Sequence, residues 1–430
     1  MKLLPYFLFG TTLVFAKTYT LSDCLKLAEK ESLTLHASKL SEQQADVAIE
    51  TAAADYYPSL SANIGNTLYD SPFIEGPQDH YRLNLGITGS LILWNGGATS
   101  LSVENAKIDK EAARYRTALA VLNIQEQVLN AFYSYLLALE KVKIAKASLD
   151  ISEAEYKNNE KLFEAGTLTK SDLILSKSDV MQKKVSLLNA EQNSDNAKTT
   201  LRQLLEIPRT ETFEIDANGL DSLNFESLEK LKEYPEILEM VQQNYPGLVA
   251  DSLASVSAKQ NIKLAGKTNS IQVSLGAQAS TGLTAWESDV YWRQLKNGYN
   301  HSVSLNISIP LIDKGTTTNK VLSAQIEAAK TEITKKETAK DLENNIETLY
   351  LNTIAAESQW EAAALELEAN EIAFEVAKSQ KELGAITYTD YLTRKTSVDT
   401  SKLTLTQAKF TTLLARTLLD LYGGAFNNSK

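Results

Sequence analysis

The sequence is poor in the residues that cross-link or interrupt a chain. It contains one cysteine among 430 residues, so an internal disulfide is impossible. Only 8 prolines are present and 43% of the residues are hydrophobic, which argues against a disordered chain. The three histidines lie on separate segments, and none has a second histidine at metal-ligand spacing (His36, His80 and His301). We expect an ordered fold without a metal site.

Positive charge and long apolar runs are also scarce. The net charge of −11 disfavours nucleic acid as a partner. Residues 1–16 combine Lys2, an apolar run too short to span a bilayer, and a small residue at Ala16, which predicts a secretory signal peptide. No later stretch approaches about 18 apolar residues, so we expect no transmembrane helix. Asp23 before Cys24 is unsuited to lipid attachment, and helical spacing predicts that Cys24 is buried.

What the sequence does contain is an internal repeat. Leu93–Ala98 matches Leu311–Thr316, and Glu164–Leu173 matches Glu382–Tyr391, at the same offset of 218 residues. Constant length with diverged side chains is typical of repeated structural units. We predict one repeat at 17–206 and a second at 228–422, with a linker at 207–227 and a tail at 423–430.

Each repeat holds two segments in which apolar and polar side chains alternate, as in strands with two different faces. The four segments are Ser59–Tyr69, Tyr81–Leu93, Ile271–Ser280 and Ser302–Ile309. Their polar set is small and almost uncharged, which suits a water-filled interior. Aromatic residues gather near the segment ends: Tyr56, Tyr57, Tyr69, Phe73, Tyr81, Trp94, Trp286, Tyr291, Trp292 and Tyr299. A soluble half-buried sheet would share the alternation, but these details favour a membrane barrel.

Four strands cannot close a barrel, and open strand edges are not tolerated in lipid. The chain must therefore oligomerise. Three copies would supply twelve strands and leave an open interior, whereas the interior of an eight-stranded barrel is filled by side chains.

Long helices follow the strands. Leu101, Ile108, Tyr115, Leu122, Leu129 and Leu136 recur every seven residues, which is coiled-coil spacing. Helices over Thr99–Phe163 and Thr317–Lys381 would each be roughly 100 Å long. Four helices of about half that length would pair with them end to end: Leu21–Asp55, Lys170–Glu206, roughly Leu228–Lys267, and Thr389–Tyr422. Residues 207–227 would form a less regular belt at mid-height.

The order and spacing of these features resemble the TolC-type outer-membrane efflux family. The resemblance rests on the doubled plan, on the LWNGG segment Leu93–Gly97, and on the glycine turns at Gly166–Asp172 and Gly384–Asp390. It implies a mixed, mainly α fold with a membrane β portion. Three chains would form a 12-stranded barrel continuous with a helical coiled-coil barrel, from the outer membrane of a Gram-negative bacterium into the periplasm.

The resemblance also implies a function and partners. The chain would be the exit duct of a tripartite efflux pump or a type I secretion system, joined by a periplasmic adaptor to an inner-membrane pump of RND, ABC or MFS type. Its cargo would be small toxic molecules or a secreted polypeptide. A non-conducting envelope scaffold is the alternative; the polar inner face argues against it, because an anchor needs no wet interior.

Asp172 and Asp390 each follow a turn glycine by six residues, and the resemblance places them at the periplasmic entrance. Three-fold symmetry would bring these carboxylates together, where they would attract cations. Alternatively, each caps its helix start, with Ser171 or Thr389 nearby. The family's other entrance contacts are absent, since Lys381, Ile386 and Thr393 stand in their places.

The two turns also resemble the family's docking surface for the adaptor. Gly166 and Gly384 would allow the reversal, and four exposed side chains would pack on a partner helix: Leu168, Thr169, Ile386 and Thr387. Alternatively, each segment is only a turn between two helices and has no role in docking.

No motif of catalysis is present. Gly266-Lys267-Thr268 has Asn261 where a phosphate loop needs glycine, and we interpret it as a helix end entering a strand. The sequence has no Gly-x-Ser-x-Gly elbow and no Cys/His pair. We expect no enzymatic activity and no cofactor.

Overall fold

The computed structural model describes residues 17–68, 81–216, 230–284 and 291–424. The expected signal peptide, His80, three of the aromatic residues (Tyr69, Phe73 and Trp286), residues 217–227 of the linker and most of the tail lie outside the described residues. The chain divides into two compact units. The helical unit comprises Met1–Ala37, Ala118–Tyr245 and Lys340–Lys430, and the sheet unit comprises Ser38–Thr117 and Pro246–Ala339.

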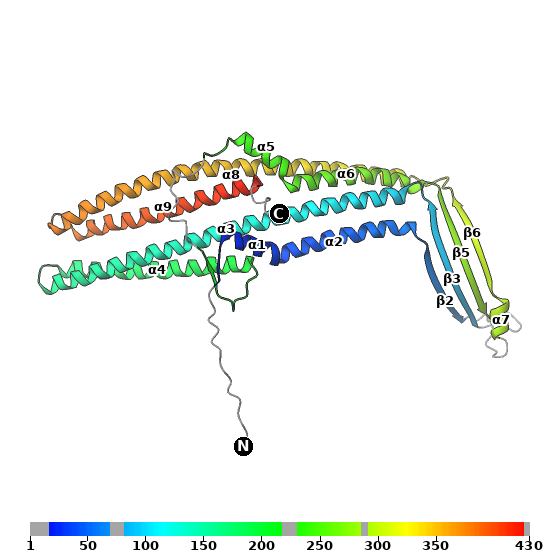
Figure 1. Cartoon of the computed structure of the whole chain (residues 1–430), viewed down its shortest axis with the longest axis horizontal. Coiled ribbons are helices and arrows are strands. Elements are labelled where there is room, and N and C mark those ends of the chain that lie inside the picture. Colours follow the sequence, from blue (N-terminus) through cyan, green and yellow to red (C-terminus); the bar gives the residue numbers. More distant parts are fainter. Residues whose placement is uncertain (1–16, 69–80, 217–229, 285–290, 425–430) are drawn as a thin grey trace, which may run out of the picture. The chain divides into compact units, whose positions relative to one another are not determined.

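The internal repeat is confirmed in the lengths of the helices (Figure 1). Helix α3 (Ala98–Glu164) and helix α8 (Thr316–Glu382) each have 67 residues. Helix α4 (Lys170–Leu204) and helix α9 (Tyr388–Tyr422) each have 35 residues. The corresponding bounds lie 218 positions apart, which is the offset of the sequence motifs.

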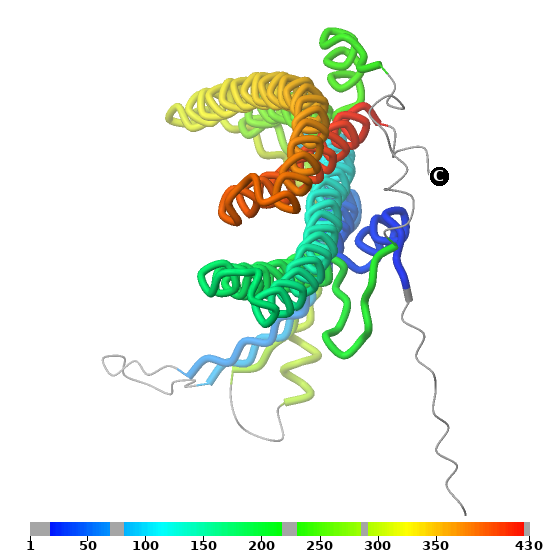
Figure 2. Tube along the Cα trace, turned by 90° about the vertical axis from the view of Figure 1, so that its left-hand side faces the viewer, coloured from blue at the N-terminus to red at the C-terminus, as the bar shows by residue number. Residues whose placement is uncertain are grey.

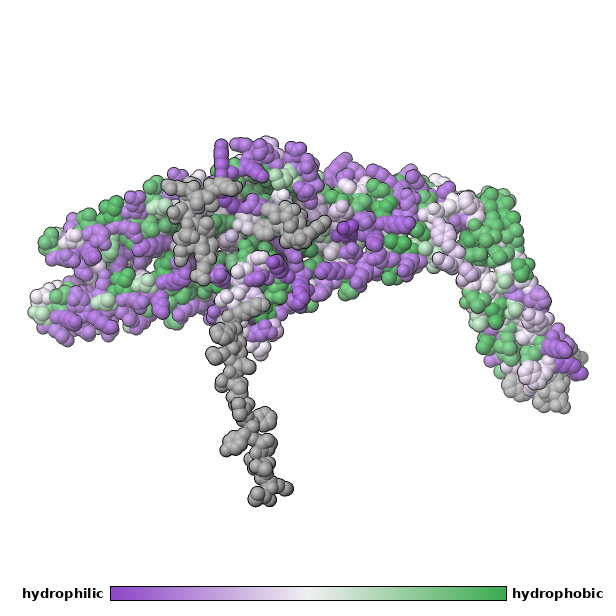
Figure 3. Space-filling model, in the orientation of Figure 1, coloured by the Kyte–Doolittle hydropathy of each residue, from purple (hydrophilic) through white to green (hydrophobic). Residues whose placement is uncertain are grey.

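The sheet unit holds one four-stranded antiparallel sheet in the order β2-β3-β5-β6. Its strands are β2 (Ser59–Leu68), β3 (Tyr81–Trp94), β5 (Gln272–Leu283) and β6 (Asn300–Ser308), which confirms the four predicted strands. The register pairs polar with polar side chains on one face: the hydroxyls of Ser59 and Ser90 lie 2.9 Å apart, and those of Ser61 and Thr88 lie 2.8 Å apart. Hydrophobic side chains are prominent over the sheet in Figure 3.

A short helix that the sequence did not predict, α7 (Tyr291–Asn297), precedes β6. Tyr291 and Trp292, expected at a strand end, belong to this helix, and Trp292 is 85% exposed. Gly266 ends helix α6, the 3₁₀ turn Lys267–Asn269 follows, and β5 begins at Gln272. The segment Gly266-Lys267-Thr268 therefore lies where a helix ends and a strand follows, as the sequence predicted.

Two predicted continuous helices are each divided in two. The first is α1 (Leu21–Glu31) and α2 (Leu33–Ala53), separated at Ser32, whose ψ of 122° is not helical and whose hydroxyl accepts from the Leu35 amide at 3.4 Å. The second is α5 (Tyr234–Asn244) and α6 (Pro246–Gly266). The predicted helix is interrupted at Tyr245, because Tyr245 precedes Pro246 and the residue before a proline disfavours the helical conformation.

The core of the helical unit surrounds a short parallel pair, β1 (Lys17–Tyr19) and β4 (Phe213–Ile215), where a less regular belt was expected. Phe213 is 1% exposed, and its ring centroid lies 5.5 Å from that of Tyr19 and 6.4 Å from that of Tyr135. Leu129 and Leu136 of the seven-residue pattern are buried. Cys24 is fully buried, as predicted.

Candidate functional site: the ends of the two helical hairpins

Helices α3 and α4 form one hairpin, and α8 and α9 form a second (Figure 2). Gly166 and Gly384 make the turns with φ of +76° and +70°, in the left-handed region that favours glycine. The Thr167 amide donates to the Leu162 carbonyl at 2.9 Å, and the Ala385 amide donates to the Gln380 carbonyl at 2.8 Å. These bonds satisfy carbonyls that each helix end would otherwise leave free.

Threonines begin the return helices. The Asp172 amide donates to Thr169 Oγ1 at 3.1 Å, and the Thr169 hydroxyl donates to Asp172 Oδ2 at 2.8 Å. Thr387 and Asp390 repeat this arrangement at 3.1 and 2.7 Å. The N-cap residues are therefore Thr169 and Thr387, whereas the sequence had offered Asp172 and Asp390 as alternatives for this role. Both carboxylates lie in the first turn, where negative charge interacts favourably with the helix dipole.

Exposure of the tip residues differs in part from the expectation. Thr169 and Thr387 are exposed, but Leu168 and Ile386 are half-buried. The large apolar side chain most open to solvent beside the second turn is Leu383, which is 82% exposed and was not predicted as a docking residue. The structure thus adds Leu383 to the apolar surface of the tips.

A buried charged cluster joins the two hairpins about three helical turns from the tips. Its centre is Lys395 on α9, whose side chain is 6% exposed. Lys395 Nζ lies 2.8 Å from Glu155 Oε2 on α3 and 3.2 Å from Asp179 Oδ2 on α4. It also donates to Ser152 Oγ at 2.8 Å. One lysine therefore connects three helices.

An aromatic platform adjoins this cluster on the side of the tips. The Tyr391 hydroxyl donates to Glu155 Oε1. Lys381 Nζ lies 4.0 Å from the centre of the Tyr391 ring and 5.0 Å from that of Tyr388, within cation–π range. Burial lowers the pKa of Lys381 and raises the pKa of Tyr388 to about 12. Lys381, which departs from the family's entrance pattern, here joins α8 to α9.

A second ionic contact between the two hairpins lies about one helical turn farther from the tips than the Lys395 cluster. Lys183 Nζ on α4 is 2.6 Å from Asp399 Oδ2 on α9, and the Ser148 hydroxyl of α3 donates to the same oxygen at 2.7 Å.

The spacing of charged residues in the sequence indicates both ionic contacts between the hairpins, although we did not predict them. On α4 the acid precedes the base by four residues (Asp179, Lys183), and on α9 the base precedes the acid by four (Lys395, Asp399). This reversed order lets two helices that run in the same direction pair acid with base twice.

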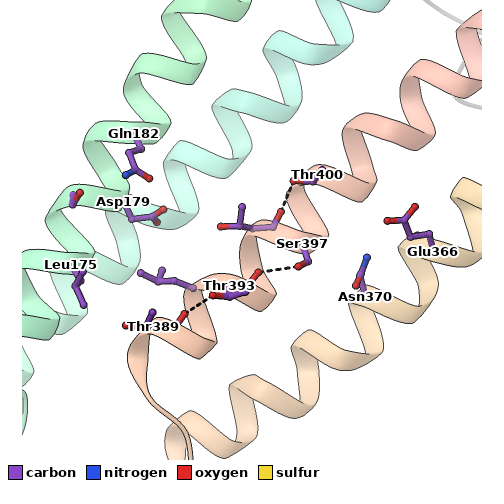
Figure 4. Close-up of a pocket in the computed structure, with 12 residues that line it drawn as sticks. Leu175, Asp179, Gln182, Glu366, Asn370, Thr389, Thr393, Ser397 and Thr400 are labelled. Atoms are coloured by element: carbon purple, nitrogen blue, oxygen red, sulfur yellow. Dashed lines mark hydrogen bonds between the residues drawn. The ribbon is translucent and has the colours of Figure 1, made fainter.

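A groove between α4, α8 and α9 lies beside the cluster (Figure 4). Hydroxyl and amide side chains line most of it. Three of the hydroxyls (Thr393, Ser397 and Thr400) donate to carbonyls of their own helix at 2.9–3.0 Å.

Among the described residues no group of three or more His, Cys, Asp or Glu side chains is arranged to hold a metal ion. None of the described helices is both long and apolar enough to cross a membrane.

Comparison with known proteins places this fold in a family. The sequence model of the "Outer membrane efflux protein" family matches residues 24–206 and 237–425, which is most of both repeats. The chain belongs to that family. This membership confirms the resemblance seen in the sequence and places the chain in the outer membrane of a Gram-negative bacterium, extending into the periplasm.

Two known proteins align with part of the chain. The cobalt-zinc-cadmium resistance protein CzcC of Cupriavidus metallidurans is 27% identical over 189 residues, 43% of each chain. Outer membrane protein TolC of Vibrio cholerae is 26% identical over 186 residues, 40% of this chain and 39% of TolC. The aligned regions thus span about two fifths of these relatives.

Solved structures match over nearly the whole chain. The structure of CusC has a TM-score of 0.79 at 16% identity and covers 94% of this chain and 91% of its own. VceC from Vibrio cholerae has a TM-score of 0.72 at 16% identity and covers 94% of this chain and 96% of its own. At this identity the likeness establishes the shared fold, mainly helical with few strands.

Proposed function

We propose that three copies of this chain assemble into a channel through which solutes leave the cell. The observation that carries the proposal is the sheet, whose outer strands β2 and β6 each pair on one side only within the described residues. Both faces of this sheet are largely open: all ten residues of β2 and all nine of β6 are exposed. A sheet with two open edges is not stable in hydrocarbon, so neighbouring copies must complete it.

The two sheet faces support a wet interior and a lipid-facing exterior. Apolar side chains on one face are strongly exposed, among them Leu60 at 78%, Ile64 at 75% and Val303 at 75%. Asn66 is the one polar residue that β2 contributes to this face, and its side-chain oxygen accepts a hydrogen bond from the Tyr81 hydroxyl at 2.8 Å. The opposite face carries serine, threonine, asparagine and glutamine, as a lumen requires.

The helices also carry apolar stripes that the single chain leaves uncovered. On α4, Ile174, Met181 and Leu188 recur every seven residues and are 57%, 49% and 63% exposed. On α2, Leu33, Leu40 and Val47 repeat the spacing at 68%, 63% and 59%. Coiled-coil stripes of this kind pack against partner helices, and copies of the same chain would supply them.

Native mass spectrometry of the detergent-extracted protein, followed by planar bilayer recording, tests this proposal. We expect a trimer that carries ion current. A stable, water-soluble monomer would contradict the assembly, and a trimer without current would favour the non-conducting scaffold.

We further propose that the hairpin tips dock a periplasmic adaptor, and through it an inner-membrane pump of RND, ABC or MFS type. Exposed Leu383 and half-buried Leu168 and Ile386 supply apolar contact surface at the tips. Leu383→Asp should abolish adaptor pull-down, because a charge would be buried in the contact. Leu322→Asp, at a 53% exposed position on the same helix far from the tip, is the control. Equal capture of both variants would refute docking at the tips.

The proposed cargo is small toxic molecules or a secreted polypeptide. CzcC is named for cobalt, zinc and cadmium resistance. Divalent cations are therefore a cargo to test first, by comparing growth of a deletion strain in these metals and in a panel of organic toxins.

A further inference from the structure

Helix α7 packs on the apolar face of the sheet. The Thr281 hydroxyl of β5 donates to the Leu295 carbonyl of α7, and α7 contacts β5. Side chains alternate between the two faces of a strand, so Thr281 shares its face with Leu275 and Ala279. Thr281 pairs with Leu85 of β3 on that face. The helix therefore lies on the side that the proposed channel turns toward lipid, and not on the polar side.

Two further contacts hold α7 against the end of β5. The Thr284 amide donates to Gln294 Oε1 at 2.9 Å. Gly298, directly after the helix, approaches the strand so closely that a Cβ there would lie 3.2 Å from the Gly282 carbonyl oxygen. The position of α7 beside β5 thus depends on contacts at both its sides of the chain, from Thr281 and from Gly298.

The other side of α7 is open and carries a tryptophan. Gln294 and Leu295 are half-buried, whereas Trp292 is 85% exposed and Arg293 and Lys296 are exposed beside it. Tryptophan is enriched at the boundary between lipid and water, where its ring contacts lipid and its N–H reaches polar groups. Charged side chains are costly in hydrocarbon and need water or headgroups within reach. This side of α7 suits the headgroup region of a membrane.

The height of α7 on the sheet agrees with such a boundary (Figure 1). A bulge between Ile92 and Trp94 pairs Trp94 with Val273, which puts Trp94 on the apolar face at the end of the sheet near the helices. The stretch from Trp94 to Leu85, the partner of Thr281, rises about 30 Å along the strand and about 23 Å along the membrane normal at a tilt of about 40°. An apolar band of about 25 Å between aromatic girdles is typical of membrane barrels.

We propose that α7 lies in the headgroup region at the outer boundary of the membrane, where Trp292 contacts lipid. The inference rests on the proposed channel, whose polar face lines the interior and whose apolar face meets lipid. In this position α7 is outside the barrel wall and leaves the outer opening clear. The rival position, over the opening, would put Trp292 in water and narrow the path of the cargo.

A nitroxide label at position 292 tests the proposal in the reconstituted protein. Trp292→Cys changes an exposed side chain, and the buried Cys24 should stay unlabelled. In vesicles of phosphatidylcholine and phosphatidylglycerol, the accessibility of the label to oxygen, which partitions into lipid, is compared with its accessibility to a water-soluble nickel chelate. Ile87→Cys and Thr88→Cys are matched controls, because these neighbours lie at mid-strand on the apolar and the polar face.

We expect the ratio of oxygen to nickel accessibility at position 292 to be several-fold above that at position 88 and below that at position 87. The labelled Trp292→Cys channel should keep the wild-type single-channel conductance. A ratio at 292 as low as that at 88, with a high ratio at 87, would overturn the placement of α7 and leave the channel intact. Equal ratios at 87 and 88 would overturn the proposed function itself.

Discussion

Lys395 shows how one residue joins both repeats. It is nearly buried and neutralised by Glu155 and Asp179, which lie on the other hairpin. Taking a buried charge out of water is costly, and good geometry with additional hydrogen bonds compensates the cost. Such a cluster specifies which faces of the two hairpins meet, because any shifted pairing would leave a charge buried alone.

Lys395→Met should destabilise the helical unit by about 3–5 kcal/mol, since it leaves two partly buried carboxylates without their cation. Lys402 on the same helix contacts Glu371 at 3.3 Å with both side chains about half exposed, so Lys402→Met should cost at most about 1 kcal/mol. Thermal denaturation followed by circular dichroism compares the two. Equal losses would show that the Lys395 cluster contributes no more than a surface pair.

Cys24 provides a pH-dependent prediction. Burial, with a smaller contribution from the Asp23 charge, raises the pKa of the Cys24 thiol from 9.0 to about 12. Because the folded-state pKa is the higher one, the contribution of this group to stability is complete below pH 9 and declines as the pH rises toward 12. Iodoacetamide at pH 9 should leave folded protein unlabelled and label it fully in denaturant. Labelling of the native protein would show that the core opens around α1.

At the scale of elements, the turns decide where each long helix reverses. A Cβ on Gly384 would meet no atom within 4 Å, so glycine is required there by its φ of +70° and not by space. Gly166 is in the same situation. The equal lengths of the hairpins follow from these two turns and the threonine caps after them.

Gly384→Ala should destabilise the second turn by about 1–2 kcal/mol through backbone strain, and Gly384→Asn should cost less, because asparagine tolerates this region. Gly266→Ala is the control, since Gly266 has an ordinary helical φ of −65°. Hydrogen exchange of the amides near residue 384 should accelerate in Gly384→Ala only. Unchanged exchange there would mean that the turn relaxes without cost.

At the scale of the whole molecule, the entrance aspartates are proposed to act as a ring of carboxylates. In the structure, Asp172 and Asp390 accept hydrogen bonds from their capping threonines. Replacing aspartate by alanine would therefore remove both a charge and the hydrogen bond that the capping threonine donates. Asparagine separates the two roles, because its amide oxygen can still accept the hydrogen bond.

The double variant Asp172→Asn, Asp390→Asn should relieve block by multivalent cations added on the periplasmic side by at least about ten-fold, because it removes six carboxylates from a trimer. Single-channel recording with increasing cation concentration measures this, and Thr169→Ala, which perturbs a cap but keeps the charge, should retain the block. Unchanged block in the double variant would exclude the carboxylate ring.

Features of this fold that depend on short sequence windows were predictable, and features that depend on distant segments were not. Strand ends, the two glycine turns and the 218-residue repeat were predicted closely, because alternation, seven-residue spacing and turn residues are properties of short windows. The helix breaks at Ser32 and Tyr245 were missed, although Pro246 was a local signal for the second. Leu168 and Ile386 were expected to be exposed, and they are half-buried.

The sequence by itself determined the lengths of the two long helices and of their return helices, the two faces of each strand and the family, because these follow from residue periodicity and turn residues along the chain. Tertiary structure alone decided the parallel pairing of β1 with β4 and the Lys395 cluster. Each of these depends on which segments, far apart in sequence, lie side by side, and helical or strand periodicity carries no information about the identity of a neighbour.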